Sequence, residues 1–111
     1  MVKRRTSALT VINKFIQAAG KKIDIKKVVL FGSHATGRFH TWSDIDIAVI
    51  SDDFEGMNKK DRLIMLSKIA WEQKITEVDA LGYTEAEFAT ESPLDLVAEI
   101  KEHGIVVYEK P

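Results

Sequence analysis

Apolar residues recur at helical spacing in two long stretches of the chain, residues 6–19 and residues 58–73. Spacings of three and four residues place them on one side of a helix, so each stretch predicts an amphipathic helix packed on a core. We expect Thr6 or Ser7 to cap the first helix and Gly20 to end it. The expected buried stripes are Leu9, Ile12, Phe15, Ile16 and Ala19 in the first helix, and Leu63, Leu66, Ile69 and Ala70 in the second.

Short runs rich in β-branched residues lie between and after these helices and predict strands. The expected strands cover residues 28–31, 44–50, 75–83 and 105–108. Thr84 to Glu87 has the capping-box pattern that begins a short helix. A last helix is expected from Ser92-Pro93 to Gly104. Its buried stripe is expected to be Leu94, Val97 and Ile100. Strands that alternate with helices predict an α/β or α+β fold, in which helices pack on a sheet.

The composition adds to this prediction mainly by excluding some classes of protein and some kinds of site. The chain has 111 residues, 45% apolar and 30% charged, which suits one soluble domain spanning residues 1–111. The formal net charge is −1, so no overall field draws the chain to nucleic acid or a membrane. There is no cysteine for a disulfide or thiolate metal site, and no apolar run long enough to span a membrane. We therefore expect a cytoplasmic protein.

The charged residues of the two long helices are expected to be solvated. The basic run at the amino terminus, residues 3–5, is short and is expected to fray. In the second helix the expected solvated residues are Lys59, Lys60, Arg62 and Lys68.

The candidate chemistry lies around the first two strands. The first strand runs into the turn Gly32-Ser33, and the second opens with Asp44 and Asp46. Because residues two apart in a strand point to the same face, the two carboxylates are expected side by side. They repel one another unless a cation lies between them, and Mg²⁺ usually binds through one or two carboxylates together with substrate phosphates. Glycine permits a close approach by a ligand, and Ser33 adds a hydroxyl donor.

Asp79 strengthens this interpretation because it lies within the apolar run of the third expected strand. A buried carboxylate without a partner or metal is costly. An Asp-x-Asp pair alone is typical of many solvated strand ends, and a Gly-Ser pair of many ordinary turns. Three carboxylates beside such a turn are typical of two-metal phosphoryl chemistry. Glu77 shares the expected strand face with Asp79, so it remains an alternative third acid.

The two motifs and their spacing resemble those of a known family. The chain carries Leu30-Phe31-Gly32-Ser33-His34-Ala35-Thr36-Gly37-Arg38 followed by Ser43-Asp44-Ile45-Asp46. This resembles the signature of the minimal nucleotidyltransferases of the DNA polymerase beta-like nucleotidyltransferase superfamily. Residues 78–88 also resemble the strand that carries the family's third acid and the helix that follows it.

The resemblance implies a mixed β-sheet flanked by helices, and transfer of a nucleoside monophosphate, such as AMP from ATP, to an acceptor hydroxyl. Asp44, Asp46 and Asp79 would be the catalytic and metal-binding residues, with Mg²⁺ or Mn²⁺ as the cofactor. The triphosphate would be held by Gly32, Ser33 and Arg38. Thr36 departs from the family, because many relatives carry arginine or lysine there; Arg38 is the cation expected to compensate.

Three functions follow as hypotheses. The first is an active nucleotidyltransferase whose partner is a separate helical HEPN-type protein, as in toxin–antitoxin pairs in which the transferase adds AMP to a toxin. The second is a module of the same fold that only binds nucleotide or partner. The third is a fragment of a metal-binding glycosyltransferase, which normally needs a much longer chain. Nucleic acid is not the expected acceptor, since proteins that grip it usually present a basic face.

Overall fold

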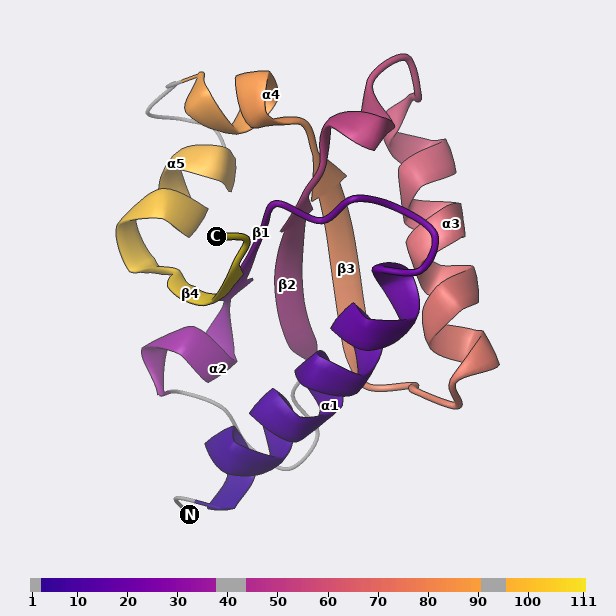
Figure 1. Cartoon of the computed structure of the whole chain (residues 1–111). Coiled ribbons are helices and arrows are strands. Elements are labelled where there is room, and N and C mark those ends of the chain that lie inside the picture. Colours follow the sequence, from indigo (N-terminus) through magenta and orange to yellow (C-terminus); the bar gives the residue numbers. More distant parts are fainter. Residues whose placement is uncertain (1–2, 38–43, 91–95) are drawn as a thin grey trace.

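A four-stranded mixed sheet forms the centre of the computed structural model, which describes residues 3–37, 44–90 and 96–111 (Figure 1). The strand order is β3-β2-β1-β4. The strands are β1 (Lys27–Phe31), β2 (Ile45–Ile50), β3 (Val78–Tyr83) and β4 (Ile105–Glu109). β1 is antiparallel to both β2 and β4, whereas β2 and β3 are parallel. The expected mixed sheet is confirmed.

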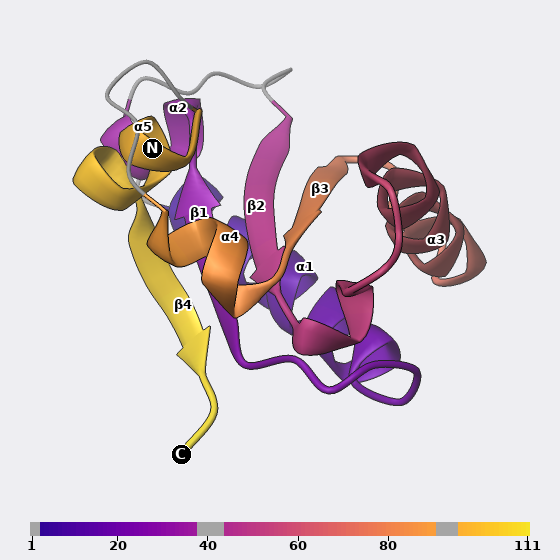
Figure 2. The same cartoon turned by 90° about the horizontal axis from the view of Figure 1, so that it is seen from above.

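Helices pack on both faces of this sheet, as the view from above shows (Figure 2). They are α1 (Lys3–Ala19), α2 (Ser33–Thr36), α3 (Lys59–Glu72), α4 (Glu85–Ala89) and α5 (Leu96–His103), with a short 3₁₀ helix, η1 (Asp52–Phe54). α1 and α3 share a core with Val28 and Leu30 of β1. α4 and α5 contribute to a second, smaller core with Val29 and Phe31. Alternate residues of one strand therefore serve opposite cores, as the pleat requires.

Most of the expected helix ends are confirmed. α1 ends at Ala19, where the Gly20 N–H donates to the Ile16 carbonyl. Asn58 caps α3 by accepting from the Asp61 N–H, and the Thr84–Glu87 capping box begins α4. Side-chain capping satisfies the orphan N–H groups of a helix's first turn.

Other expectations are wrong. α1 begins at Lys3, upstream of Thr6 and Ser7, because the basic run at residues 3–5 consists of good helix formers and continues the helix. Leu9 and Leu63 are exposed, since each lies at the margin of its helix's apolar stripe. β3 begins at Val78, so Glu77 precedes the strand. The expected start of the last helix at Ser92-Pro93, and Leu94 of its expected buried stripe, lie outside the described residues and stay predictions.

Arg62 is also not solvated, as it was expected to be; it is buried in the core. Its guanidinium donates to both carboxylate oxygens of Glu87, at 2.5 and 3.1 Å, and to the carbonyl oxygens of Met57 and Gly82. The hydrogen bond from Arg62 lowers the pKa of Glu87 to about 2. This pair ties α3 to α4 across the end of β3. The other residues of α3 that were expected to be solvated are exposed, as predicted: Lys59, Lys60 and Lys68.

No helix within the described part of the chain combines the length and the apolar character that crossing a membrane would require.

Candidate active site

The first part of the candidate site is the turn that follows β1, at the lower edge of the sheet in Figure 1. Gly32 adopts a φ of 73°, and its carbonyl accepts hydrogen bonds from the N–H groups of Ala35 and Thr36, which closes the single turn of α2. Gly37 ends α2 in the left-handed conformation. The expected Gly-Ser turn is confirmed. Ser33 therefore begins a short helix at the edge of the sheet.

Asp46, on β2, lies between the strand that leads into this turn, β1, and the strand that carries Asp79, β3. In the sheet it pairs with Phe31 of β1 on one side and with Asp79 of β3 on the other. Paired residues of neighbouring strands point to the same face and lie about 5 Å apart. Asp46 and Asp79 are therefore neighbours at the same edge of the sheet, one strand away from the residue that precedes Gly32. This register could not be derived from the sequence.

Asp44 lies just outside β2, one residue before its first residue, and is exposed. Its charge nevertheless reaches the site, because the pKa of Asp46 is raised by burial first, then by the charges of Asp79 and Asp44. The buried His34 of α2 acts in the opposite direction. The charges of Asp79 and Asp44 therefore act on Asp46 and, together with burial, disfavour its ionised form.

Glycine at position 32 is required by the packing as well as by its φ. A Cβ atom placed on Gly32 would overlap the Oδ2 atom of Asp46. A larger residue would thus have to push the Asp46 carboxylate out of position. Gly37 has a similar φ of 80°, but a Cβ atom there would meet nothing within 4 Å. Gly32, and not Gly37, fixes the space beside Asp46.

The donor set suits a hard divalent cation. Carboxylate oxygens are the ligands that Mg²⁺ and Mn²⁺ prefer, and a nearby cation would offset the burial and the neighbouring negative charges that raise the pKa of Asp46. Among the described residues, however, no three carboxylate or imidazole groups stand close enough together to form a ready-made metal cage.

The other expected site residues differ in where they lie. Glu77 accepts the N–H of Ile45 through its carbonyl at 2.7 Å and the N–H of Thr76 through its side chain. It therefore lies before β3 and has no partner position beside Asp46 in the sheet. Arg38, expected to hold the triphosphate, lies outside the described residues. His34, which directly follows Gly32-Ser33, was a weaker candidate for a phosphate contact than these residues.

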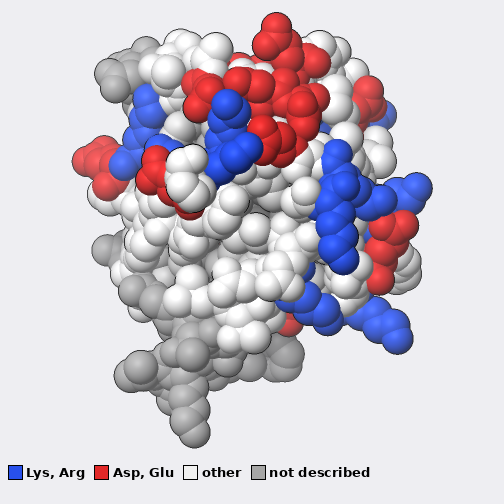
Figure 3. Space-filling view, viewed as in Figure 1, with Lys and Arg blue, Asp and Glu red and all other residues white. Residues whose placement is uncertain are grey.

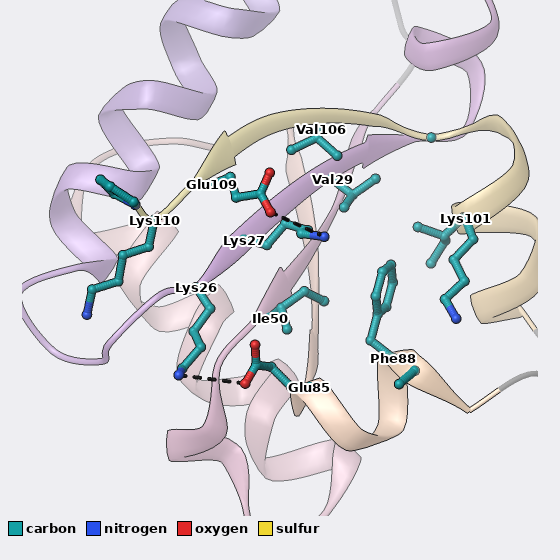
Figure 4. A pocket seen from close by; sticks show the side chains of 14 residues that line it. Lys26, Lys27, Val29, Ile50, Glu85, Phe88, Lys101, Val106, Glu109 and Lys110 are labelled. Carbon is teal, nitrogen blue, oxygen red and sulfur yellow. Dashed lines mark ion pairs between the residues drawn. The ribbon is translucent and has the colours of Figure 1, made fainter.

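A large hollow of the molecule lies elsewhere, as Figure 4 shows. It is a half-open groove of about 780 Å³ between α4, α5, β1 and β4. Its floor includes Val29, Ile50 and Phe88, and none of the three expected acids lines it. Lys26 and Lys27 at its rim pair with Glu85 and Glu109, at 3.6 and 3.7 Å. The groove is therefore separate from the carboxylate site, at the other end of β1.

A family model described as "Nucleotidyltransferase domain" matches residues 12–107, which is most of the chain. The match contains the Gly32 turn and all three carboxylates. No curated protein sequence matches the chain closely enough to be informative.

Solved structures share the fold. A candidate nucleotidyltransferase from Sulfolobus solfataricus superposes with a TM-score of 0.74 at 22% identity, covering 98% of this chain and 86% of that one. A toxin–antitoxin structure with AMP-PNP gives a TM-score of 0.62 at 22% identity, covering 92% and 73%. The MntA-HepT toxin–antitoxin gives 0.58 at 22% identity, covering 91% and 72%. At these identities the likeness concerns the fold.

Proposed function

Because the chain belongs to the nucleotidyltransferase-domain family, we propose that it transfers a nucleoside monophosphate, AMP from ATP in the simplest case, to an acceptor hydroxyl. The observation that carries the proposal is the register of the sheet, which pairs Asp46 with Asp79 beside the Gly32 turn. In the reaction the acceptor oxygen bonds to the α-phosphorus, the bond to the bridging oxygen breaks, and pyrophosphate leaves. The proton of the hydroxyl passes to a carboxylate or to water.

Each residue has a distinct task in this proposal. Asp44, Asp46 and Asp79 would hold Mg²⁺ or Mn²⁺, which when bound supplies positive charge at the attacking and leaving oxygens. Asp79 would also help to activate the acceptor oxygen. Gly32 leaves room for the triphosphate to approach the main chain, and Ser33 donates its hydroxyl to a phosphate oxygen. Arg38 is the proposed cation for the triphosphate.

The proposed acceptor is a hydroxyl on a separate helical protein of the HEPN type, so that the chain would act as the antitoxin of a toxin–antitoxin pair. Two observations support this. Structures of toxin–antitoxin complexes, one with AMP-PNP, share the fold. The net charge of −1 is unlike that of proteins that hold a nucleic-acid strand. The partner would bring its hydroxyl to the carboxylates, and positioning of this kind contributes much of the catalysis.

A second candidate is a module that binds nucleotide or partner without turnover. One observation favours it: the described carboxylates do not form a compact cluster. The two candidates differ in whether AMP becomes covalently attached.

The test is co-expression with the product of the adjacent gene, followed by mass spectrometry of that partner. We expect added AMP units, and their loss with Asp44→Asn. Glu55→Gln, an exposed carboxylate in the turn after η1, is the matched control and should keep full transfer. Binding without added AMP would favour the second candidate. Elongation of a labelled RNA or DNA primer, with no partner bound or modified, would contradict both.

A further inference from the structure

A second groove of the molecule lies between the carboxyl-terminal parts of α1 and α3, on the other face of the sheet from the groove in Figure 4. Its volume is about 750 Å³, and Ala18 and Ile69 supply its apolar lining. We call it the α1–α3 groove. The rest of its lining is polar: Lys14, Gln17, Lys21, Lys22, Glu72 and Gln73. Sites for drug-like molecules are mostly apolar, so this lining indicates a different kind of ligand.

The polar side chains of the α1–α3 groove are not engaged with one another. Within residues 3–37, 44–90 and 96–111, none of these side chains makes a hydrogen bond or an ion pair. The groove in Figure 4 differs, because its Lys26 and Lys27 pair with Glu85 and Glu109. An ammonium group has three N–H donors and a side-chain amide has two. The α1–α3 groove therefore presents many donors to a ligand that enters it.

The charges that line the groove are mainly positive, since three lysines lie there with one carboxylate, that of Glu72. Lys68 lies one turn before Glu72 on α3 and adds a positive charge beside it. The next acidic residue after Lys22 is Asp24, whose carboxylate already accepts a hydrogen bond of 2.7 Å from Lys110. Figure 3 shows several Lys and Arg side chains together on the right, where α3 lies in Figure 1. The groove therefore favours an anion, although the whole chain has a net charge of −1.

The end of α1 explains part of this arrangement. A lysine in the last turn of a helix, or just after it, complements the negative end of the helix dipole, which accounts for Lys21 and Lys22. Lys14 lies more than one turn before Ala19, the last residue of α1, and there the effect has faded. A role at the helix end thus leaves Lys14 unexplained, whereas an anion in the groove uses all three lysines.

A chain of phosphate groups matches this lining. Lysine binds phosphate as a point charge, and several lysines around one groove favour an anion with several charges. A water molecule takes up about 30 Å³ of liquid, so the groove has room for more than a single phosphate group. None of its described lining residues is aromatic, so it offers no ring on which a nucleobase could stack. A phosphate chain without bases is therefore favoured over a nucleic-acid strand.

We infer that the α1–α3 groove binds an oligophosphate, a linear chain of phosphate groups such as inorganic tripolyphosphate. The inference does not rest on the proposed function. Asp46 pairs with Phe31, which contributes to the core under α4 and α5, whereas α1 and α3 pack on the opposite face of the sheet. The groove is therefore separate from the carboxylate site, and each can be tested without the other.

The test is isothermal titration calorimetry of the full chain with sodium tripolyphosphate, at constant ionic strength and without divalent cations. Under these conditions the carboxylates of the candidate active site have no metal through which to hold the ligand. We expect saturable binding, and we expect Lys14→Gln combined with Lys21→Gln and Lys22→Gln to weaken it at least about tenfold. Glu72→Gln should strengthen it about threefold, because this substitution removes the carboxylate of the groove.

The matched control is Lys26→Gln combined with Lys27→Gln and Lys110→Gln. It removes the same number of positive charges from the groove in Figure 4, and it should change the affinity for tripolyphosphate by less than about twofold. These lysines take part in exposed ion pairs, which contribute little to stability, so we expect the control to fold. Arg38→Gln should also keep the binding, because Arg38 belongs to the triphosphate site of the proposed function.

Three results would overturn the inference. The first is the absence of saturable binding, an unchanged affinity without Lys14, Lys21 and Lys22, or an equal loss in the matched control. The second is an equal affinity for citrate, a tricarboxylate, which would make the groove a general anion site. The third is tighter binding of a single-stranded RNA oligonucleotide than of tripolyphosphate, lost with the same three lysines, which would make the groove a nucleic-acid surface.

Discussion

Two groups of charged side chains in this molecule are built on opposite principles. At the edge of the sheet, Asp44, Asp46 and Asp79 bring like charges together, and the pKa of Asp46 is raised by burial and by its two neighbours. Between α3 and α4, Arg62 and Glu87 bring opposite charges together, and the pKa of Glu87 is lowered to about 2 by the hydrogen bond from Arg62. One group is unfavourable in the folded chain and the other is favourable.

We expect the two groups to affect different properties: the carboxylates to affect activity, and the Arg62–Glu87 pair to affect stability. A buried guanidinium with its hydrogen bonds satisfied, to Glu87 and to two carbonyl oxygens, holds elements of the fold in place. The raised pKa of Asp46 means that its ionised form costs stability, and carboxylates perturbed in this way are typical of sites that bind a cation or substrate. Substitutions in the two groups should therefore have opposite signatures: loss of activity without loss of stability in the first, and the reverse in the second.

The largest expected effect is that of Asp46→Asn. We expect AMP transfer to fall about a thousandfold, because Asp46 lies between Gly32 and Asp79 and would hold the metal. The free energy of unfolding should stay the same or rise, since the amide removes a charge that is disfavoured by burial first and then by Asp79 and Asp44, as the raised pKa of Asp46 shows. Transfer assays with labelled ATP and urea unfolding measure the two quantities. Full Mg²⁺-dependent transfer by the variant, or a marked loss of stability, would break the comparison.

The second prediction separates Asp79 from Glu77. Asp79→Asn should lower transfer about a hundredfold and reduce the increase in melting temperature that Mg²⁺ with ATP produces, whereas Glu77→Gln should leave both nearly unchanged. The reason is that Asp79 pairs with Asp46 in the sheet, while Glu77 precedes β3. A structure with Mn²⁺ bound is the direct measurement. A metal that contacts Glu77 while Asp79 remains beyond a bridging water would reverse the assignment.

The third prediction concerns the favourable pair. Glu87→Gln should lower the free energy of unfolding by about 2 kcal/mol, because Arg62 would remain buried without a carboxylate partner. Glutamine can still accept the Thr84 N–H, so the capping box is kept and the charge is what the substitution removes.

Glu85→Gln is the matched control for this third prediction. It lies on the same helix in an exposed ion pair of 3.6 Å with Lys26, and it should change stability by less than about 0.5 kcal/mol. Transfer activity should be nearly unchanged in both variants. Equal stability of the Glu87 and Glu85 variants would show that the Arg62 pair has no special role.

The sequence predicted which helices and strands form better than it predicted which of their residues are buried. Strand and turn composition predicted the strands and the Gly-Ser turn, because these signals are local, whereas the mixed sheet was what the resemblance to the family implied. Leu63 was expected in the core and is exposed, whereas Arg62 was expected in solvent and is buried. The helical periodicity did place Arg62 in line with Leu66 and Ile69. A charged residue is seldom buried, however, unless hydrogen-bonding or oppositely charged groups surround it.

The partners themselves were beyond the reach of local patterns. Glu87 is 25 residues from Arg62, and nothing in either segment indicates the pairing. Likewise, the sequence showed that Asp79 lies in a strand, but the parallel pairing that brings it next to Asp46 depends on the order of strands in the sheet. The packing of Asp46 against Gly32 depends on the same register. The sequence thus identified the candidate residues, but which of them lie next to one another depends on the tertiary fold.

The smallest expected effect is a pair of opposite pH dependences. Glu87 has a folded-state pKa of about 2, below its usual 4.5, so its stabilising contribution is complete above about pH 4.5 and is lost as the pH falls toward 2. The difference in stability between wild type and Glu87→Gln should shrink over that range. Asp46 has a raised folded-state pKa, so its ionised form costs stability at neutral pH, and that cost disappears as the pH falls through the raised pKa toward the usual 3.8. Asp46→Asn should therefore be the more stable protein at neutral pH and should lose this advantage in acid. Urea unfolding of the three proteins from pH 7 to pH 2.5 measures both trends, and trends of the same sign would mean that the two groups do not differ as described.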